Sequence, residues 1–189
     1  MSWLTKIIEF LLSLFKSVTP VESGITENIE SGITENNNEQ NTEKEKKKMS
    51  KYFTLEELLT SSTARQKSIE NLPSWEIVER LNTVACFLDN LREAWGSGIV
   101  INSGFRNKKL NEAVGGVTNS CHLLGWAVDI HPANSKMKEF KEFVVEWLKD
   151  QVFDEAIIEK NGKGEEWIHI QLYSPKGFQR KKIFNLEVK

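Results

Sequence analysis

The chain contains three histidines, and two of them, His122 and His169, stand near carboxylates in segments rich in turns and short strands. Asp129 follows His122 by seven positions, and Glu166 precedes His169 by three. Two imidazoles and one carboxylate form a three-ligand zinc set that leaves a fourth position for water, as catalytic zinc sites do. A carboxylate outside the metal shell must then accept a proton from that water, and Glu166 is the candidate for this base.

The alternation of side chains along a strand constrains this site. Residues three apart on a regular strand point to opposite faces, so Glu166 and His169 can share a site only if the strand begins after Glu166. Glycines just upstream would supply the necessary turn. His131 has the same strand parity as Asp129 and could compete as a ligand, or it could be a solvent-facing residue before Pro132. The same spacings also occur in ordinary hydrogen-bonded pairs that hold no metal.

Hydrophobic periodicity and turn residues predict the elements that must position these side chains. Thr54 and Glu57 form a capping box for a short helix, and Gly96 follows a longer amphipathic helix that it would end. The predicted segments are a helix over 74–95, a strand over 99–102, a turn at 115–116, a strand over 127–131, a helix over 135–149 and strands over 156–159 and 167–173. Helices come first and short, irregularly joined strands follow, which predicts an α+β fold with an antiparallel or mixed sheet and flanking helices.

The sequence before Met49 differs from the rest of the chain in its composition and hydrophobic pattern. Residues 1–20 predict an amphipathic helix that could contact a membrane peripherally through residues 3–18. A weak signal sequence, a partner-binding helix and a helix packed on the main domain are the alternatives. Residues 21–48 contain the repeat Glu-Ser-Gly-Ile-Thr-Glu-Asn at 22–28 and 30–36 and then an almost wholly polar run, which predicts a disordered linker. Residues 49–189 form the predicted catalytic domain.

Charge and cysteine content exclude several functional classes. The 25 Lys and Arg nearly balance the 27 Asp and Glu, so the net charge of −2 does not favour nucleic acid as a partner. Two cysteines are too few for a disulfide framework. Cys86 is expected in the core, whereas Cys121 could be a semi-buried side chain, a further metal contact or a reactive thiol. The basic stretch 176–182 is either a solvated face or a contact for anionic wall polymers.

A longer pattern surrounds the candidate ligands and resembles a known family. The pattern comprises Ser103-Gly104-Phe105-Arg106, Asn111, Val114-Gly115-Gly116, Ser120-Cys121-His122, Gly125, Ala127, Asp129-Ile130 and Glu166-Trp167-Ile168-His169. Its order and spacing resemble the zinc D-alanyl-D-alanine carboxypeptidases and dipeptidases, which share their fold with the hedgehog signalling domain and include phage endolysins. The resemblance covers about Met49 to Tyr173, including the opening Tyr52-Phe53-Thr54-Leu55-Glu56-Glu57.

The resemblance implies a role for each matching position. His122, Asp129 and His169 match the zinc ligands, and Glu166 matches the catalytic base. Arg106 matches the arginine that stabilises the substrate carbonyl or carboxylate, a role that suits a guanidinium fork. Ser120 matches a hydroxyl that helps bind substrate. Alternatively, Arg106 is a surface arginine, and Ser120 is a loop hydroxyl that caps backbone.

The implied activity is hydrolysis of D-alanine-containing stem peptides of peptidoglycan by a monomeric zinc metallopeptidase. Whether it is a carboxypeptidase, a dipeptidase or an endolysin-type endopeptidase depends on the loops around the cleft. The alternative function is a non-catalytic, zinc-containing module that binds cell wall or protein. The expected location is the cell envelope or a membrane surface, or the cytoplasm for a phage lysis protein. Met49 is a candidate alternative start, because the compact family members begin at this point.

Overall fold

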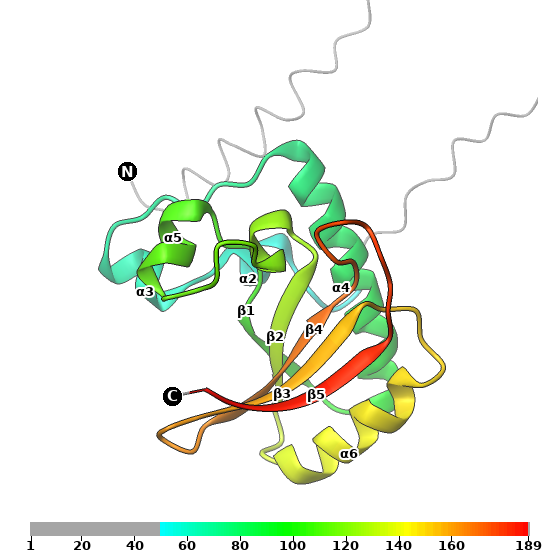
Figure 1. Cartoon of the computed structure of the whole chain (residues 1–189). Coiled ribbons are helices and arrows are strands. Elements are labelled where there is room, and N and C mark those ends of the chain that lie inside the picture. The colour runs from blue at the N-terminus through cyan, green and yellow to red at the C-terminus, as the bar shows by residue number, and fades with distance from the viewer. Residues whose placement is uncertain (1–49, 189) are drawn as a thin grey trace, which may run out of the picture. The chain divides into compact units, whose positions relative to one another are not determined.

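A computed structural model describes residues 50–188 of the chain (Figure 1). The predicted amphipathic helix over residues 1–20, the predicted linker over 21–48 and the candidate start at Met49 lie outside the described residues. The fold below therefore concerns the predicted catalytic domain alone.

The described residues form an α+β fold around one five-stranded mixed sheet, which confirms the predicted fold class. The strand order is β1-β2-β4-β3-β5, and every neighbouring pair is antiparallel except β3 and β5. The strands are β1 (Ile99–Ser103), β2 (Ala127–Pro132), β3 (Glu155–Asn161), β4 (Glu166–Gln171) and β5 (Lys182–Val188). Strands β2 and β4, which pair with each other inside the sheet, carry two of the three candidate metal ligands.

Six helical segments accompany the sheet in the described part of the chain. They are α2 (Leu55–Leu59), α3 (Ser62–Gln66), α4 (Trp75–Trp95), α5 (Lys108–Ala113), the 3₁₀ helix η1 (Cys121–Leu124) and α6 (Met137–Leu148). The capping box at Thr54 and Glu57 is present, and Gly96 ends α4 in the left-handed conformation at a φ of 71°. Within residues 50–188, no helix has both the length and the apolar character needed to cross a bilayer.

The main hydrophobic core lies on one face of the sheet. Ile130 of β2 and Ile168 of β4 are almost fully buried there against Leu88 of α4 and Phe140 of α6. Figure 1 shows α4 and α6 lying along this face. Because side chains alternate across a strand, the intervening residues of β2 and β4 point to the opposite face, where polar groups can gather.

Four elements were absent from the sequence prediction. The helices α3 and α5 and the 3₁₀ helix η1 have only five, six and four residues, too few to show a helical period. A side-chain cap begins each of the three: Ser61 accepts from the amide of Ala64, Asn107 from that of Leu110, and Ser120 from that of His122. Strand β5 begins at Lys182, the last residue of the basic stretch 176–182. The amide of Lys182 donates to the carbonyl of Asp154, which fixes the start of the strand.

A buried carboxylate anchors the beginning of the described chain. Asp89 of α4 is 2% exposed and accepts hydrogen bonds from the Ser50 hydroxyl at 2.9 Å and from the amides of Lys51 and Tyr52 at 2.7 and 3.0 Å. These donors precede α2, so the carboxylate holds the segment leading into α2 on the long helix. A buried carboxylate is tolerated here because several donors satisfy it.

We predict that Asp89→Ala lowers the free energy of unfolding by about 2–3 kcal/mol, because donors in residues 50–52 lose their acceptor. Urea denaturation of the full chain measures this change. Glu93→Gln is the matched control, since Glu93 meets Lys51 at 3.1 Å with both side chains more than half exposed. Its effect should stay within about 0.5 kcal/mol. Equal losses for the two variants would contradict the anchoring role of Asp89.

Candidate metal centre

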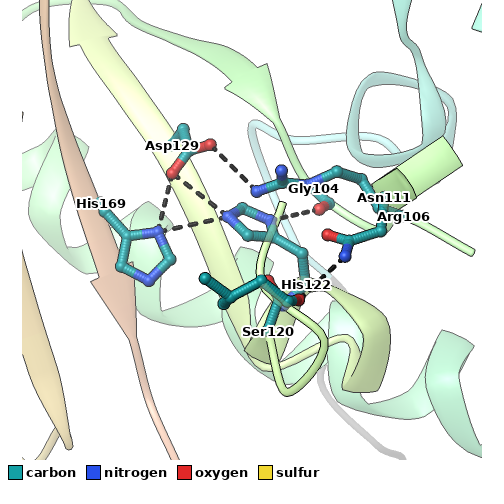
Figure 2. Close-up of polar contacts among 8 residues, drawn as sticks. Gly104, Arg106, Asn111, Ser120, His122, Asp129 and His169 are labelled. Atoms are coloured by element: carbon teal, nitrogen blue, oxygen red, sulfur yellow. Dashed lines mark hydrogen bonds and ion pairs between the residues drawn. The ribbon is translucent and has the colours of Figure 1, made fainter. Parts of the chain in front are cut away.

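The structure brings the three predicted ligands together on the face of the sheet opposite the main core (Figure 2). One carboxylate oxygen of Asp129, Oδ1, lies 3.2 Å from Nε2 of His122 and 2.8 Å from Nδ1 of His169. The two ring nitrogens lie 3.2 Å apart. Three potential ligand atoms from distant parts of the sequence therefore point at one another.

Strand pairing positions two of these residues. The register of β2 against β4 places Asp129 directly opposite His169, and it places Val128 opposite Ile170 and Ile130 opposite Ile168. The isoleucines are buried in the core, so the Asp129–His169 pair must lie on the other face. The hydrophobic alternation of two strands thus positions two of the three ligands.

The third ligand, His122, comes from η1 and is oriented by a backbone carbonyl. Nδ1 of His122 donates a hydrogen bond to the carbonyl of Gly104 at 2.6 Å, which directs Nε2 toward Asp129 and His169. A hydrogen bond of this kind fixes the tautomer and orientation of a metal-ligating imidazole. Gly104 itself lies so close to α2 that an added Cβ would clash with the backbone of Leu58.

The ligand set fits a zinc ion by its chemistry and spacing. Ligand atoms at about 2.0–2.1 Å from a tetrahedral zinc lie about 3.3 Å from one another. The observed separations of 2.8–3.2 Å are close to this value, so only a small outward shift is needed. Two nitrogens and one oxygen, from His122, His169 and Asp129, would hold the metal and leave one side for water or substrate.

The electrostatics favour the metal-binding protonation state at Asp129 and His122, but not at His169. Burial alone would raise the pKa of the Asp129 carboxyl, but the facing His122 and His169 rings lower it well below its usual range. Burial lowers the pKa of His122, which favours the neutral imidazole. Burial alone would lower the pKa of His169, but the hydrogen bond and charge of Asp129 raise it. A divalent metal requires an ionised carboxylate and neutral imidazoles, so a bound metal would displace a proton from His169.

Arg106 lies beside the cluster and retains an unused donor. Its Nη2 is 3.6 Å from Oδ2 of Asp129, the oxygen turned away from the imidazoles, and its side chain is 16% exposed. The Nε of Arg106 is buried and has no hydrogen-bond partner. The alternative of a surface arginine is therefore wrong. A buried, unpaired guanidinium donor is costly unless a ligand satisfies it, so the Arg106 side chain is suited to bind an anion or a polarised carbonyl.

A groove of about 640 Å³ runs from the cluster along the sheet. It is lined by Asn102, Asp129, His131, Glu165, Glu166 and Trp167. Asp129 connects this groove to the ligand set, so a bound chain could approach the cluster from it.

Comparison with protein families gives a match over this fold and site. The model of the family described as Peptidase M15 matches residues 51–171, which is more than half of the chain. The chain belongs to the peptidase M15 family. This finding confirms the resemblance to the zinc D-Ala-D-Ala carboxypeptidase-like peptidases. A search of curated proteins gives no match. M15 peptidases are zinc-dependent, and the His122–Asp129–His169 group is the one that could hold a metal within residues 50–188.

Two other residues of the matched motif have structural contacts in this M15 peptidase. The Ser120 hydroxyl accepts from the amide of His122 at 3.3 Å and caps η1, which agrees with the alternative of a loop hydroxyl. The Cys121 thiol is buried and donates to the carbonyl of Tyr173 at 3.4 Å. Burial raises the pKa of Cys121 to about 11, so the thiol is protonated at neutral pH. Cys121 is neither in the metal group nor a reactive thiolate.

His131, the competing ligand suggested by strand parity, is not part of the metal group. Its Nδ1 lies within hydrogen-bonding distance of the side-chain oxygen of Asn102 on the neighbouring strand. His131 belongs instead to the wall of the groove. Strand parity correctly predicted its face, but its position two residues further along β2 takes it too far from the cluster.

The structure does not place Glu166 with the cluster as expected. Strand β4 begins at Glu166, so the prediction that it begins after this residue is wrong. Glu166 shares the parity of Ile168, and its carboxylate meets the ammonium of Lys141 on α6 at 2.9 Å. Glu166 touches the groove, but its charged end is paired with the helix that covers the core face.

Glu159 of β3 is a site residue that the sequence analysis missed. The register pairs Ile157 with His169 and Glu159 with Trp167, so Glu159 lies on the cluster face. Burial raises the pKa of the half-buried Glu159 carboxyl, and the charge of Asp129 raises it further. A sequence signal existed in the turn at Gly162 and Gly164, which implies that β3 and β4 pair as a hairpin. The exact register was still needed to place Glu159 beside the site.

We predict that Gly104→Ala weakens zinc binding by about 10- to 100-fold, because the new methyl group would displace the carbonyl that orients His122. Competition with a chromogenic chelator measures this affinity. Gly162→Ala is the matched control, because a Cβ added there would have no neighbour within 4 Å. Unchanged zinc affinity in a folded Gly104→Ala protein would show that this carbonyl does not orient the ligand.

Proposed function

We propose that this M15 peptidase is a zinc metallopeptidase that hydrolyses D-alanine-containing stem peptides of peptidoglycan. The observation that carries the proposal is the buried Nε of Arg106, an unpaired cationic donor directly beside an open three-ligand group. A peptide that ends in D-alanine presents a carboxylate and a nearby amide carbonyl, which are the groups that a guanidinium and a Lewis acid recognise together.

Each residue of the site has a definite task in this reaction. His122, Asp129 and His169 would hold zinc, which when bound supplies a Lewis acid that polarises a carbonyl and makes water more acidic. The hydrogen bond to Gly104 keeps the His122 ring in place. Arg106 binds the terminal carboxylate or stabilises negative charge that develops on the carbonyl oxygen. The reaction also needs a carboxylate that accepts the proton of the attacking water.

The groove offers a route for a peptide chain. Its lining combines the Trp167 ring with polar side chains of Asn102 and His131, so it can contact both the apolar and the amide parts of a peptide. The extent of the groove occupied by substrate would distinguish cleavage at the chain end from cleavage within a cross-bridge. The identity of the released fragment reports this difference directly.

The full chain incubated with purified stem peptides should release a D-alanine-containing fragment, and a chelator should abolish the release. Mass spectrometry of the products identifies the bond cleaved. His122→Ala should carry less than about a tenth of the wild-type zinc by elemental analysis and show no hydrolysis, because a ligand is lost. Wild-type protein that binds zinc and cell wall but cleaves no peptide would favour a non-catalytic binding module.

Arg106→Lys should lower kcat/KM for stem peptides by about 10²- to 10³-fold, because a lysine cannot reproduce the planar fork. Zinc content should remain at the wild-type level, since Arg106 lies 3.6 Å from the outer oxygen of Asp129 and is not a ligand. Arg65→Lys, an exposed position in α3, is the matched control. Steady-state kinetics on both variants test the role, and unchanged kinetics for Arg106→Lys would remove it from the site.

A further inference from the structure

The two faces of β4 separate the acidic residues near the site. Glu166, Ile168 and Ile170 alternate with Trp167 and His169, and the two isoleucines are 1% exposed in the core. Glu166 therefore starts on the α6 side of the sheet, where its carboxylate lies 2.9 Å from the ammonium of Lys141. To act at the cluster, this carboxylate would have to leave its cation and pass the edge of the strand.

Strand β3 presents a different carboxylate to the cluster face. Its register sets Ile157 opposite His169 and Glu159 opposite Trp167, and each of these pairs lies on a common face. Ile158, the residue between them, lines a pocket with Lys141 and Glu142 of α6, which indicates that its neighbours point the other way. Glu159 thus reaches the site face without any change of backbone.

The position of Glu159 suits a carboxylate that acts from outside the metal shell. The register places Glu159 one same-face position along β3 from Ile157, the residue directly opposite the candidate ligand His169. Yet Glu159 is not a member of the group whose ligand atoms lie within 4.8 Å of one another. Trp167, the residue opposite Glu159 in the register, lines the groove.

We propose that Glu159, and not Glu166, is the general base of this peptidase. The inference rests on the proposed function and adds the residue that moves the proton. The carboxylate of Glu159 takes one proton from the attacking water while the water oxygen bonds to the scissile carbonyl carbon. As the carbon–nitrogen bond breaks, Glu159 returns that proton to the leaving nitrogen. The second proton of the water remains on the new carboxyl group, which ionises as the amine product becomes protonated.

Three glutamate-to-glutamine variants of the full chain test this assignment. Glu159→Gln removes the proposed base, and Glu166→Gln removes the rival. Glu155→Gln is the control, since Glu155 lies on the same strand with the same parity but at the far end, opposite Gln171. For each variant, the measurements are zinc per chain by elemental analysis, the Kd for a stem peptide by calorimetry, and kcat on that peptide.

Glu159→Gln is expected to keep one zinc per chain and a peptide Kd within about threefold of wild type, while kcat falls by about 10²- to 10⁴-fold. Glu155→Gln is expected to keep kcat within about threefold of wild type, because it does not remove the base. Glu166→Gln is expected to change mainly the peptide Kd, because Glu166 lines the groove, and to lower kcat far less than Glu159→Gln does. Loss of zinc in Glu159→Gln would make Glu159 a ligand or a structural residue and overturn the proposal. Retained kcat in Glu159→Gln together with a large loss in Glu166→Gln would return the role to Glu166.

These outcomes remain separate from failure of the proposed function. If wild-type protein with bound zinc does not cleave stem peptides, the proposed function fails, and the assignment of a base to that reaction falls with it. If wild-type protein cleaves them, the substrate class stands, and the comparison of Glu159→Gln with Glu166→Gln decides the base alone.

Discussion

The pairing of β2 with β4 is the constraint on which the rest of this molecule depends. In one register it buries Ile130 and Ile168 against α4 and α6, and on the opposite face it sets Asp129 beside His169. A slip of one residue would exchange these faces and place a carboxylate and an imidazole in the core. The hydrophobic packing that stabilises the fold is therefore also what holds two candidate metal ligands together.

The segment after β1 joins the remaining site residues to this pair. The amide of Phe105 donates to the carbonyl of Leu58, which draws the segment against α2. On the same segment the carbonyl of Gly104 accepts from the His122 ring, and the amide of Arg106 donates to the His122 carbonyl at 3.2 Å. One tightly packed loop thus positions a candidate ligand and the neighbouring guanidinium, so the proposed metal binding and anion recognition would share a single structural support.

The sequence was sufficient to predict the α+β fold and the long helix, and to select three residues that the structure brings together as candidate ligands, because residue type and period carry that information. It did not identify Glu159, the carboxylate that we propose as the base. Strand parity correctly showed that the side chains of Glu166 and His169 point to opposite faces of a regular strand. The expectation that both residues share one site therefore required the strand to begin after Glu166. The structure keeps the strand regular and supplies Glu159 from β3. Which residue stands beside His169 depends on hairpin register, a nonlocal property that turn residues alone do not determine.

Asp154 and Arg106 are both largely buried, but only Asp154 has all of its hydrogen bonds within the protein. Asp154 is fully buried, and Arg180 and Gln171 satisfy both of its oxygens with side-chain and backbone donors, fixing the chain that leads into β5. Burial alone would raise the pKa of Asp154, but these hydrogen bonds lower it. Arg106 is also mostly buried, yet its Nε has no partner and its contact with Asp129 is long. A buried donor without an acceptor costs free energy. Arg106 Nε lacks a hydrogen-bond partner, whereas both oxygens of Asp154 have donors, and bound substrate would supply the acceptor that Arg106 lacks.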